Sequence, residues 1–191
     1  MAILLCACST TRFIGEEKPV VDELTLVAPY SRIDCLVPYS NFFYSDSLSA
    51  LSEQLIIKAI EQQNLPVKKV VSVVGRSNQE ALDGDYEWIK KLSIYEDLTK
   101  KRLPAAMQAF LSTQPSRYAL MVYSEGFVWS RRITLEEDQL RYESKIWLLV
   151  ADVRTGRLVY FNKSTPEEAD PLNERDITRR IGYLLKEFKG E

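Results

Sequence analysis

The segment from Ile33 to Gln63 constrains the fold more than any other part of the chain, because it reads as a strand, a loop and a long amphipathic helix. The predicted strand, Ile33–Pro38, is short and apolar and is closed by proline. Apolar residues spaced three and four apart predict one buried helix face, formed by Leu48, Leu51, Leu55, Ile56, Ala59 and Ile60. Asp46 or Ser47 can cap the first turn, and Asn64 can end the helix in a left-handed conformation.

Apolar runs elsewhere in the chain predict a sheet. The other strands are expected at Glu23–Ala28, Val67–Val74, Tyr118–Trp129, Tyr142–Ala151 and Leu158–Phe161. The run Val67–Val74 is β-branched and nearly continuous, which is typical of a strand buried on both faces. Asp152–Gly156 predicts a tight turn, because Gly156 can adopt a positive φ and so close a hairpin.

Three further helices or helix segments are indicated between and after these strands. They are expected at Tyr86–Leu98, from Pro104 onward, and after Asp170–Pro171, where Asp170 can cap the first turn. Residues 86–111 can form one kinked helix or two separate helices. The polar segments Arg76–Asp85 and Arg131–Gln139 are expected to be exposed loops.

The predicted element order, β-β-α-β-α-(α)-β-β-β-α, indicates an α/β (α+β) fold. Each helix is amphipathic on one side only, which predicts a mixed β-sheet with helices packed on it. The first helix joins two strands that we expect to be adjacent, through a right-handed crossover.

Composition excludes several classes of function. The 191-residue chain has a net charge of −2, which argues against nucleic acid as a partner because such proteins carry a clustered basic excess. The sequence contains no histidine, so Ser-His-Asp and Cys-His catalysis and the usual zinc sites are excluded. No metal and no cofactor is expected, since the seven glycines are scattered and form no phosphate-binding loop or dinucleotide fingerprint.

The amino terminus indicates a lipid anchor. Leu5-Cys6-Ala7-Cys8 resembles a bacterial lipobox, and a polar stretch follows it. The resemblance implies that residues 1–7 are the remnant of a signal peptide, that Cys8 is lipidated with palmitate-type chains, and that 8–22 is a tether to a single α/β domain at 23–191. Ser9 after the cysteine implies retention in the outer membrane, with the domain in the periplasm or at the cell surface. We expect Met1 to lie inside a longer signal peptide; the alternative is a buried amino-terminal strand with two core cysteines.

The order of elements also resembles that of a known group. The strand Asp34–Tyr39, the following loop, and Ser45–Leu48 opening a helix look like the amino-terminal unit of TolB-like and curli-secretion-like lipoproteins. The segments Lys145–Asp152 and Arg157–Phe161 are similar to the closing hairpin of those proteins. The resemblance implies an envelope lipoprotein that binds other proteins or assembles, and it carries no catalytic motif.

The predicted loop after the strand Ile33–Pro38 is rich in aromatic residues. One interpretation is that Tyr39, Phe42, Phe43 and Tyr44 form a rim that binds a protein partner, because aromatic side chains are favoured at interfaces. The other interpretation is that Phe42 or Phe43 folds back over the helix. The lone Cys35 is expected to be a small core residue.

Three hypotheses for function follow from these features. The first is a non-catalytic envelope lipoprotein that acts as an interaction or assembly module, with envelope proteins as partners, contact with the membrane only through its lipid, and oligomerisation left open. The second is a carboxylate-dependent enzyme acting on glycans, for which the available acids are Asp83, Asp85, Glu87, Glu125, Glu136, Glu137 and Asp138. The third is a small-molecule binding module, which would need a pocket with converging polar groups.

Overall fold

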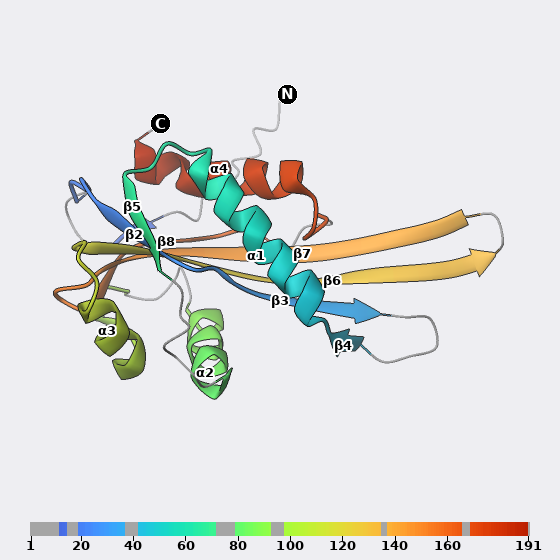
Figure 1. Ribbon diagram of the computed structural model, residues 1–191, viewed down its shortest axis with the longest axis horizontal. Coiled ribbons are helices and arrows are strands. Elements are labelled where there is room, and N and C mark those ends of the chain that lie inside the picture. Colours follow the sequence, from blue (N-terminus) through green and yellow to red (C-terminus); the bar gives the residue numbers. More distant parts are fainter. Residues whose placement is uncertain are drawn as a thin grey trace, which may run out of the picture.

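A mixed β-sheet with helices on both faces forms the framework of the protein (Figure 1). The computed structural model describes residues 12–14, 19–36, 42–71, 79–92, 98–134, 137–165 and 169–190. The strands found in this part are β1 (Arg12–Phe13), β2 (Leu24–Val27), β3 (Tyr30–Leu36), β4 (Phe42–Tyr44), β5 (Val67–Val71), β6 (Tyr118–Thr134), β7 (Glu137–Asp152) and β8 (Arg157–Lys163). The helices are α1 (Asp46–Glu61), α2 (Gln79–Lys90), α3 (Ala105–Ser112) and α4 (Glu174–Lys189), with a short 3-10 turn at Leu98–Lys100. The predicted fold class is confirmed.

The strand order is β1-β8-β7-β6-β2-β5, with β3 and β4 continuing beside β6 where β2 ends. Strand β2 is parallel to both β5 and β6, β3 is parallel to β6, and the remaining pairs are antiparallel. The predicted adjacency of the strands before and after α1 is wrong, because β5 pairs with β2 and not with β3. Ala28 and Pro29 interrupt the run into two strands, and both of these lie along β6.

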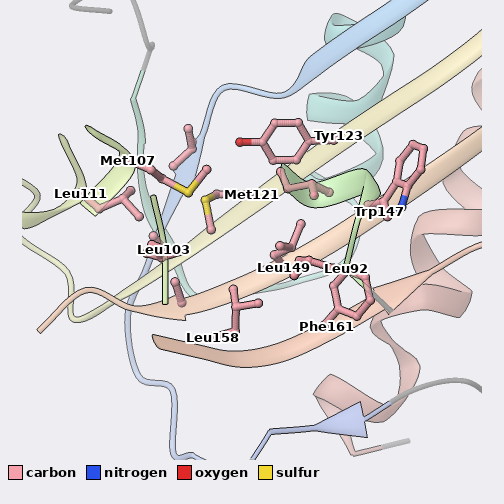
Figure 2. Close-up of a cluster of buried hydrophobic side chains, with 14 of the residues drawn as sticks. Leu92, Leu103, Met107, Leu111, Met121, Tyr123, Trp147, Leu149, Leu158 and Phe161 are labelled. Carbon is pink, nitrogen blue, oxygen red and sulfur yellow. The ribbon is translucent and has the colours of Figure 1, made fainter. Parts of the chain in front are cut away.

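Two hydrophobic cores lie on opposite faces of the sheet. One lies between the sheet and helices α2 and α3, where Met107 and Leu111 pack with Met121, Leu149 and other apolar side chains (Figure 2). The other lies under α1 and α4. Alternate residues of β6 and β7 enter the two cores, as the period of two along a strand requires.

Helix α4 follows its predicted pattern closely. Its buried face contains Ile177, Ile181, Leu184, Leu185 and Phe188 as expected, and Gly190 ends it in a left-handed conformation with φ of 85°. The cap differs from the prediction. Asn173 caps the helix by accepting a hydrogen bond from the Asp176 N–H, and Asp170 instead accepts one from Leu172 N–H in the preceding turn.

Helix α1 departs from its pattern in two places. Ser45, and not Asp46 or Ser47, is the residue that caps its first turn, through a hydrogen bond from the Leu48 N–H. Leu51 is 43% exposed, so the apolar face is narrower than predicted. Asn64 has φ of 54°, which confirms the predicted left-handed stop.

Several predicted segments have a different structure. Strand β5 is an edge strand in the described sheet, and Lys68, Lys69 and Val70 are exposed, so the predicted two-sided burial is wrong. Helix α2 begins at Gln79, inside the segment expected to be a loop, and it is separate from α3. The residues Phe42–Tyr44, also expected to be a loop, pair with β3 as β4.

The largest difference lies between β6 and β7. The segment Arg131–Gln139 was expected to be an exposed connection, but β6 runs to Thr134 and β7 starts at Glu137. Residues 126–134 and 137–143, which we call the arm, form the outer part of the β6–β7 ladder, and the far end of this ladder extends beyond all four described helices (Figure 1). At about 3.3 Å per residue, the β6 side of the arm is about 30 Å long. The sequence of Arg131–Gln139 is mostly polar, and a polar segment predicts an exposed connection.

Candidate functional site

A pocket opens where the arm leaves the body of the protein, between α2 and the strands β3, β6 and β7. Its volume is about 640 Å³, which lies within the usual range for small-molecule sites. Strand register places its sheet residues in two rows across β3, β6 and β7. The inner row is Arg32, Glu125 and Lys145, and the outer row is Asp34, Phe127 and Glu143.

Glu125 occupies the centre of the inner row and is held from α2. Its Oε2 accepts a hydrogen bond from the Tyr86 hydroxyl and lies 3.3 Å from Lys90 Nζ, which also lies 3.9 Å from Glu87 Oε1. Burial, together with the hydrogen bond to Glu125, raises the pKa of Tyr86 well above its usual range. The phenol therefore stays protonated as a donor at neutral pH, and it fixes the Glu125 carboxylate against α2.

Aromatic rings lie beside the inner row, because Tyr30, Tyr123 and Trp147 form the next row on the same face of the sheet and Tyr86 of α2 packs on them. Tyr30 and Tyr123 on the sheet have ring centroids 6.3 Å apart, and Tyr86 packs at 5.7 Å from Tyr30 and edge-on at 6.2 Å from Trp147. Lys145 places its ammonium 4.6 Å from the centroid of the Trp147 ring, within the range of a cation–π contact. Contacts of this kind between aromatic rings are stabilising, so a packed aromatic row borders the charged row on its inner side.

The second candidate site is the outer edge of β7 in the arm. Ile146 directs its N–H and C=O to Ser164, just past the end of β8, and the Ser144 carbonyl accepts a hydrogen bond of 2.7 Å from the buried Arg180. Backbone groups alternate in direction along an antiparallel strand. Those of Tyr142 and Leu140 therefore face outward as well, where no strand in the described part of the chain pairs with them.

The predicted aromatic rim is only partly covered by the structure. Phe43 and Tyr44 are 48% and 41% exposed and lie on β4, at the edge of the described sheet opposite the open edge of β7. Of Phe42, the backbone is described and pairs with Leu36. Tyr39 and the predicted lipidation site Cys8 lie outside the described residues. Their proposed roles remain predictions.

Other predicted features can also be located. Of the seven candidate acids, Glu87 and Glu125 line the pocket and Asp85 is buried on α2; the side chains of the other four lie outside the described part. Cys35 is half-buried on β3, not a fully buried core residue. In the described ranges no group of His, Cys, Asp or Glu is placed to hold a metal ion. None of the helices that the structure describes is both long and apolar enough to cross a bilayer.

Sequence reasoning missed most of the pocket. Glu125 and Glu87 were named among the acids, but Arg32, Lys145 and Phe127 were not. The signal that could have found part of it is the register of β6 and β7, which sets Glu125 opposite Lys145 as a cross-strand pair of opposite charge. The parallel pairing of β3 with β6, which adds Arg32, has no local signal in the sequence.

Comparison with known proteins gives similar structures but no family. No family model matches the sequence, and no curated protein matches it. A structure of the PelC dodecamer from Paraburkholderia phytofirmans is similar, with 12% identity over 96% of this chain and 99% of that chain and a TM-score of 0.47. The C-terminal domain of LpoB from Salmonella enterica has 12% identity over 79% of this chain and 86% of that one, with a TM-score of 0.37. Lipoprotein GNA1162 from Neisseria meningitidis has 9% identity over 88% and 99%, with a TM-score of 0.39. At these identities, function has to be argued from the geometry of this chain.

Proposed function

We propose that this protein is a non-catalytic envelope lipoprotein that binds other envelope proteins by adding one of their extended segments to the open edge of β7. The observation that carries the proposal is the arm, whose β7 side, residues 137–143, is about 23 Å long and contributes no described side chain to either hydrophobic core. Exposed edges attract strands, and stable proteins usually shorten or cover them. An edge of this length that is left open is suited to β-strand addition, in which main-chain hydrogen bonds supply affinity.

The base of the arm is built to hold this edge in place. Arg180 is only 3% exposed and donates hydrogen bonds to the Ser144 hydroxyl, the Ser144 carbonyl and the Ser164 hydroxyl. The Ser144 hydroxyl in turn donates to the Ala169 carbonyl. Through these hydrogen bonds the buried Arg180 side chain connects Ser144 of β7 to Ser164, which directly follows the end of β8. The strand beyond that point is therefore presented in a fixed direction.

The lipid anchor is the second part of the proposal. Lipidation at Cys8 and a tether over 8–22 would keep the domain at the outer membrane while leaving the arm free to reach a partner. The aromatic residues Tyr39, Phe42, Phe43 and Tyr44 would add side-chain contacts at the β4 edge. Oligomerisation through the same edges is compatible with this arrangement.

The experiment uses a photo-crosslinking amino acid, p-benzoylphenylalanine, in place of Tyr142 in a chain expressed with its upstream sequence in bacteria. Irradiation should join the arm to envelope proteins of discrete mass. The same amino acid at Tyr183, which is 60% exposed on α4, serves as the position control and should give no such product.

A second substitution tests whether the backbone makes the contact. Leu140→Pro removes an outward N–H, whereas Leu140→Ala changes the side chain and keeps that N–H. We expect the cross-linked product to disappear with proline and to persist with alanine. Equal yields from the two variants would show that the β7 edge does not pair with the partner.

The anchor is tested separately by feeding a labelled fatty acid and fractionating the cells. Label that depends on Cys8 and recovery in the outer membrane are the expected results. A Cys8→Ala variant that keeps its label would refute lipidation at this residue. Phe43→Ala with Tyr44→Ala tests the aromatic rim, since unchanged cross-linked products would exclude a role for it.

A further inference from the structure

The pocket under α2 contains charges of both signs, and two of them, on Lys145 and Glu143, have no ion-pair partner among the described residues. Lys145 has a contact with the Trp147 ring but no carboxylate within ion-pair distance among the described residues. Glu143 lies two residues before Lys145 on β7. It is exposed, and its carboxylate has no polar partner in the described part of the chain. Arg32 Nε lies 4.0 Å from Asp34 Oδ1, and the two side chains are 47% and 34% exposed, so this ion pair contributes little to stability.

The charges are arranged by row. Arg32 and Lys145 place cations at both ends of the inner row, and Asp34 and Glu143 place carboxylates at both ends of the outer row. Phe127, between the two carboxylates, provides an apolar surface. The rows are two residues apart along the strands, which corresponds to about 7 Å.

The overall charge of the pocket favours a ligand with both signs of charge. Its cations are Arg32, Lys90 and Lys145, and its carboxylates are Asp34, Glu87, Glu125 and Glu143, so three positive charges face four negative ones and the sum is −1. A phosphate or another compact anion would meet four carboxylates, and a simple cation would meet three bases. A zwitterion can place each of its charges against the opposite row.

The separation of the rows limits the size of such a ligand. In a single amino acid the ammonium and carboxylate are attached to the same carbon and lie about 3 Å apart, which is less than half of the spacing between the rows. One additional residue adds a Cα–Cα step of about 3.8 Å and brings the two charges to about 6 Å. A dipeptide also fits a pocket of about 640 Å³.

We propose that this pocket binds a short zwitterionic peptide, a dipeptide with free termini, with its carboxylate at Lys145 and Arg32 and its ammonium at Glu143 and Asp34. An apolar side chain of the peptide lies against Phe127. The charge of Glu125 is offset by Lys90, whose Nζ lies 3.3 Å from Glu125 Oε2, so the cations of Arg32 and Lys145 remain for the peptide carboxylate. This site is independent of the proposed β7 interaction.

The test is calorimetric titration of the purified protein with the dipeptide alanyl-phenylalanine. Its N-acetylated form, its C-terminal amide and free phenylalanine are titrated beside it. Binding of the free dipeptide is expected, with at least tenfold weaker binding of each other compound, because each lacks one charge or the spacing. Equal binding of the blocked peptides, or no heat with the free dipeptide up to about 10 mM, a concentration well above a Kd of 1 mM, would overturn the proposal.

Two variants assign the charges to residues. Lys145→Gln should weaken binding of the free dipeptide about tenfold. It should not change the already weak binding of the C-terminal amide, because the amide has no carboxylate for Lys145 to bind. Glu143→Gln should likewise weaken binding of the free dipeptide about tenfold and leave binding of the N-acetylated form unchanged, since that form has no ammonium. Lys58→Gln, an equal change of charge at an exposed residue of α1, should change nothing. If Lys145→Gln and Lys58→Gln weaken binding equally, the assigned orientation is wrong.

A separate readout guards against a folding defect. Lys145 contacts the Trp147 ring, so the melting temperature of Lys145→Gln is measured beside that of the unaltered protein. Glu143 has no polar partner in the described residues, so Glu143→Gln should fold normally. If Glu143→Gln melts like the unaltered protein and binds the dipeptide equally well, the ammonium site is refuted without any question of misfolding.

Discussion

Gly126 lies at the base of the arm, where the backbone of β6 approaches its neighbours very closely. A Cβ added there would lie 2.7 Å from the Glu143 carbonyl oxygen, 3.0 Å from Ser144 Cβ and 3.2 Å from Pro171 Cβ. The first of these is a backbone atom within the β6–β7 ladder, so it cannot move aside as a flexible side chain would. We therefore expect Gly126→Ala to destabilise the protein.

The size of the effect follows from two opposing contributions. Replacing glycine by alanine inside a regular element stabilises a protein by about 0.5–1 kcal/mol, through the entropy of the unfolded chain. Forcing a methyl group into a packed position typically costs about 1–3 kcal/mol. Because the contact at 2.7 Å is shorter than real Cβ contacts show, strain exceeds the gain, and the net loss is about 1–2 kcal/mol.

Urea and thermal denaturation followed by circular dichroism measure this loss. A destabilisation of this size lowers the melting temperature of a chain of this length by about 2–8 °C. Gly84→Ala is the matched control, because nothing lies within 4 Å of a Cβ at that exposed position on α2. It should raise stability by about 0.5–1 kcal/mol. A Gly126→Ala protein as stable as Gly84→Ala would refute the close approach at the arm base.

Three other substitutions have defined outcomes. Burial raises the pKa of Glu53 in the folded protein, although the hydrogen bond from the Ser31 N–H opposes this shift. The contribution of Glu53 to the free energy of unfolding is therefore largest below its ordinary pKa of 4.5 and is lost as the pH rises through the raised value. Glu53→Gln should remove this pH dependence, as measured by urea titrations at pH 4 and pH 7. Gly156→Ala should lower the free energy of unfolding by about 1 kcal/mol or more, because the φ of 66° is unfavourable for a residue with a side chain, and equal stability would argue against that turn. Arg180→Met should destabilise the protein by about 1–3 kcal/mol in urea denaturation, because it leaves the buried Ser144 carbonyl without its donor. A variant as stable as the unaltered protein would contradict the role of Arg180 at the arm base.

The parts of the fold that the sequence predicts well are those that bury a core. Helix α4 and the β7–β8 hairpin have apolar residues at the spacing that burial demands, and Gly156 and Gly190 mark positions where the backbone needs a positive φ. The predicted burial is wrong for strand β5, because its local sequence does not determine its position in the sheet. Strand β5 has the β-branched composition of a buried strand, but it lies at the sheet edge because β2 is enclosed between it and β6.

The arm and the pocket show a different limit of sequence reasoning. Residues 131–139 are mostly polar, and a polar segment predicts an exposed connection. In the structure the β6–β7 pairing continues through this segment as far as Thr134 and Glu137. The pocket depends on the register of three strands at once. The pairing of Glu125 with Lys145 follows from the hairpin, but Arg32 joins them only through the parallel contact of β3 with β6. Only tertiary structure determines that contact.

Residue-resolved hydrogen exchange of the arm amides, in the protein alone and in its cross-linked complex, tests the proposed interaction most directly. The account predicts that the N–H groups of Leu140 and Tyr142 exchange fast in the protein alone, while those of Arg141 and Glu143 are protected by β6. In the complex, Leu140 and Tyr142 should become protected as well, because a partner strand accepts their hydrogen bonds. Protection of Leu140 and Tyr142 already in the protein alone, or no change in the complex, would contradict the open edge as the binding site.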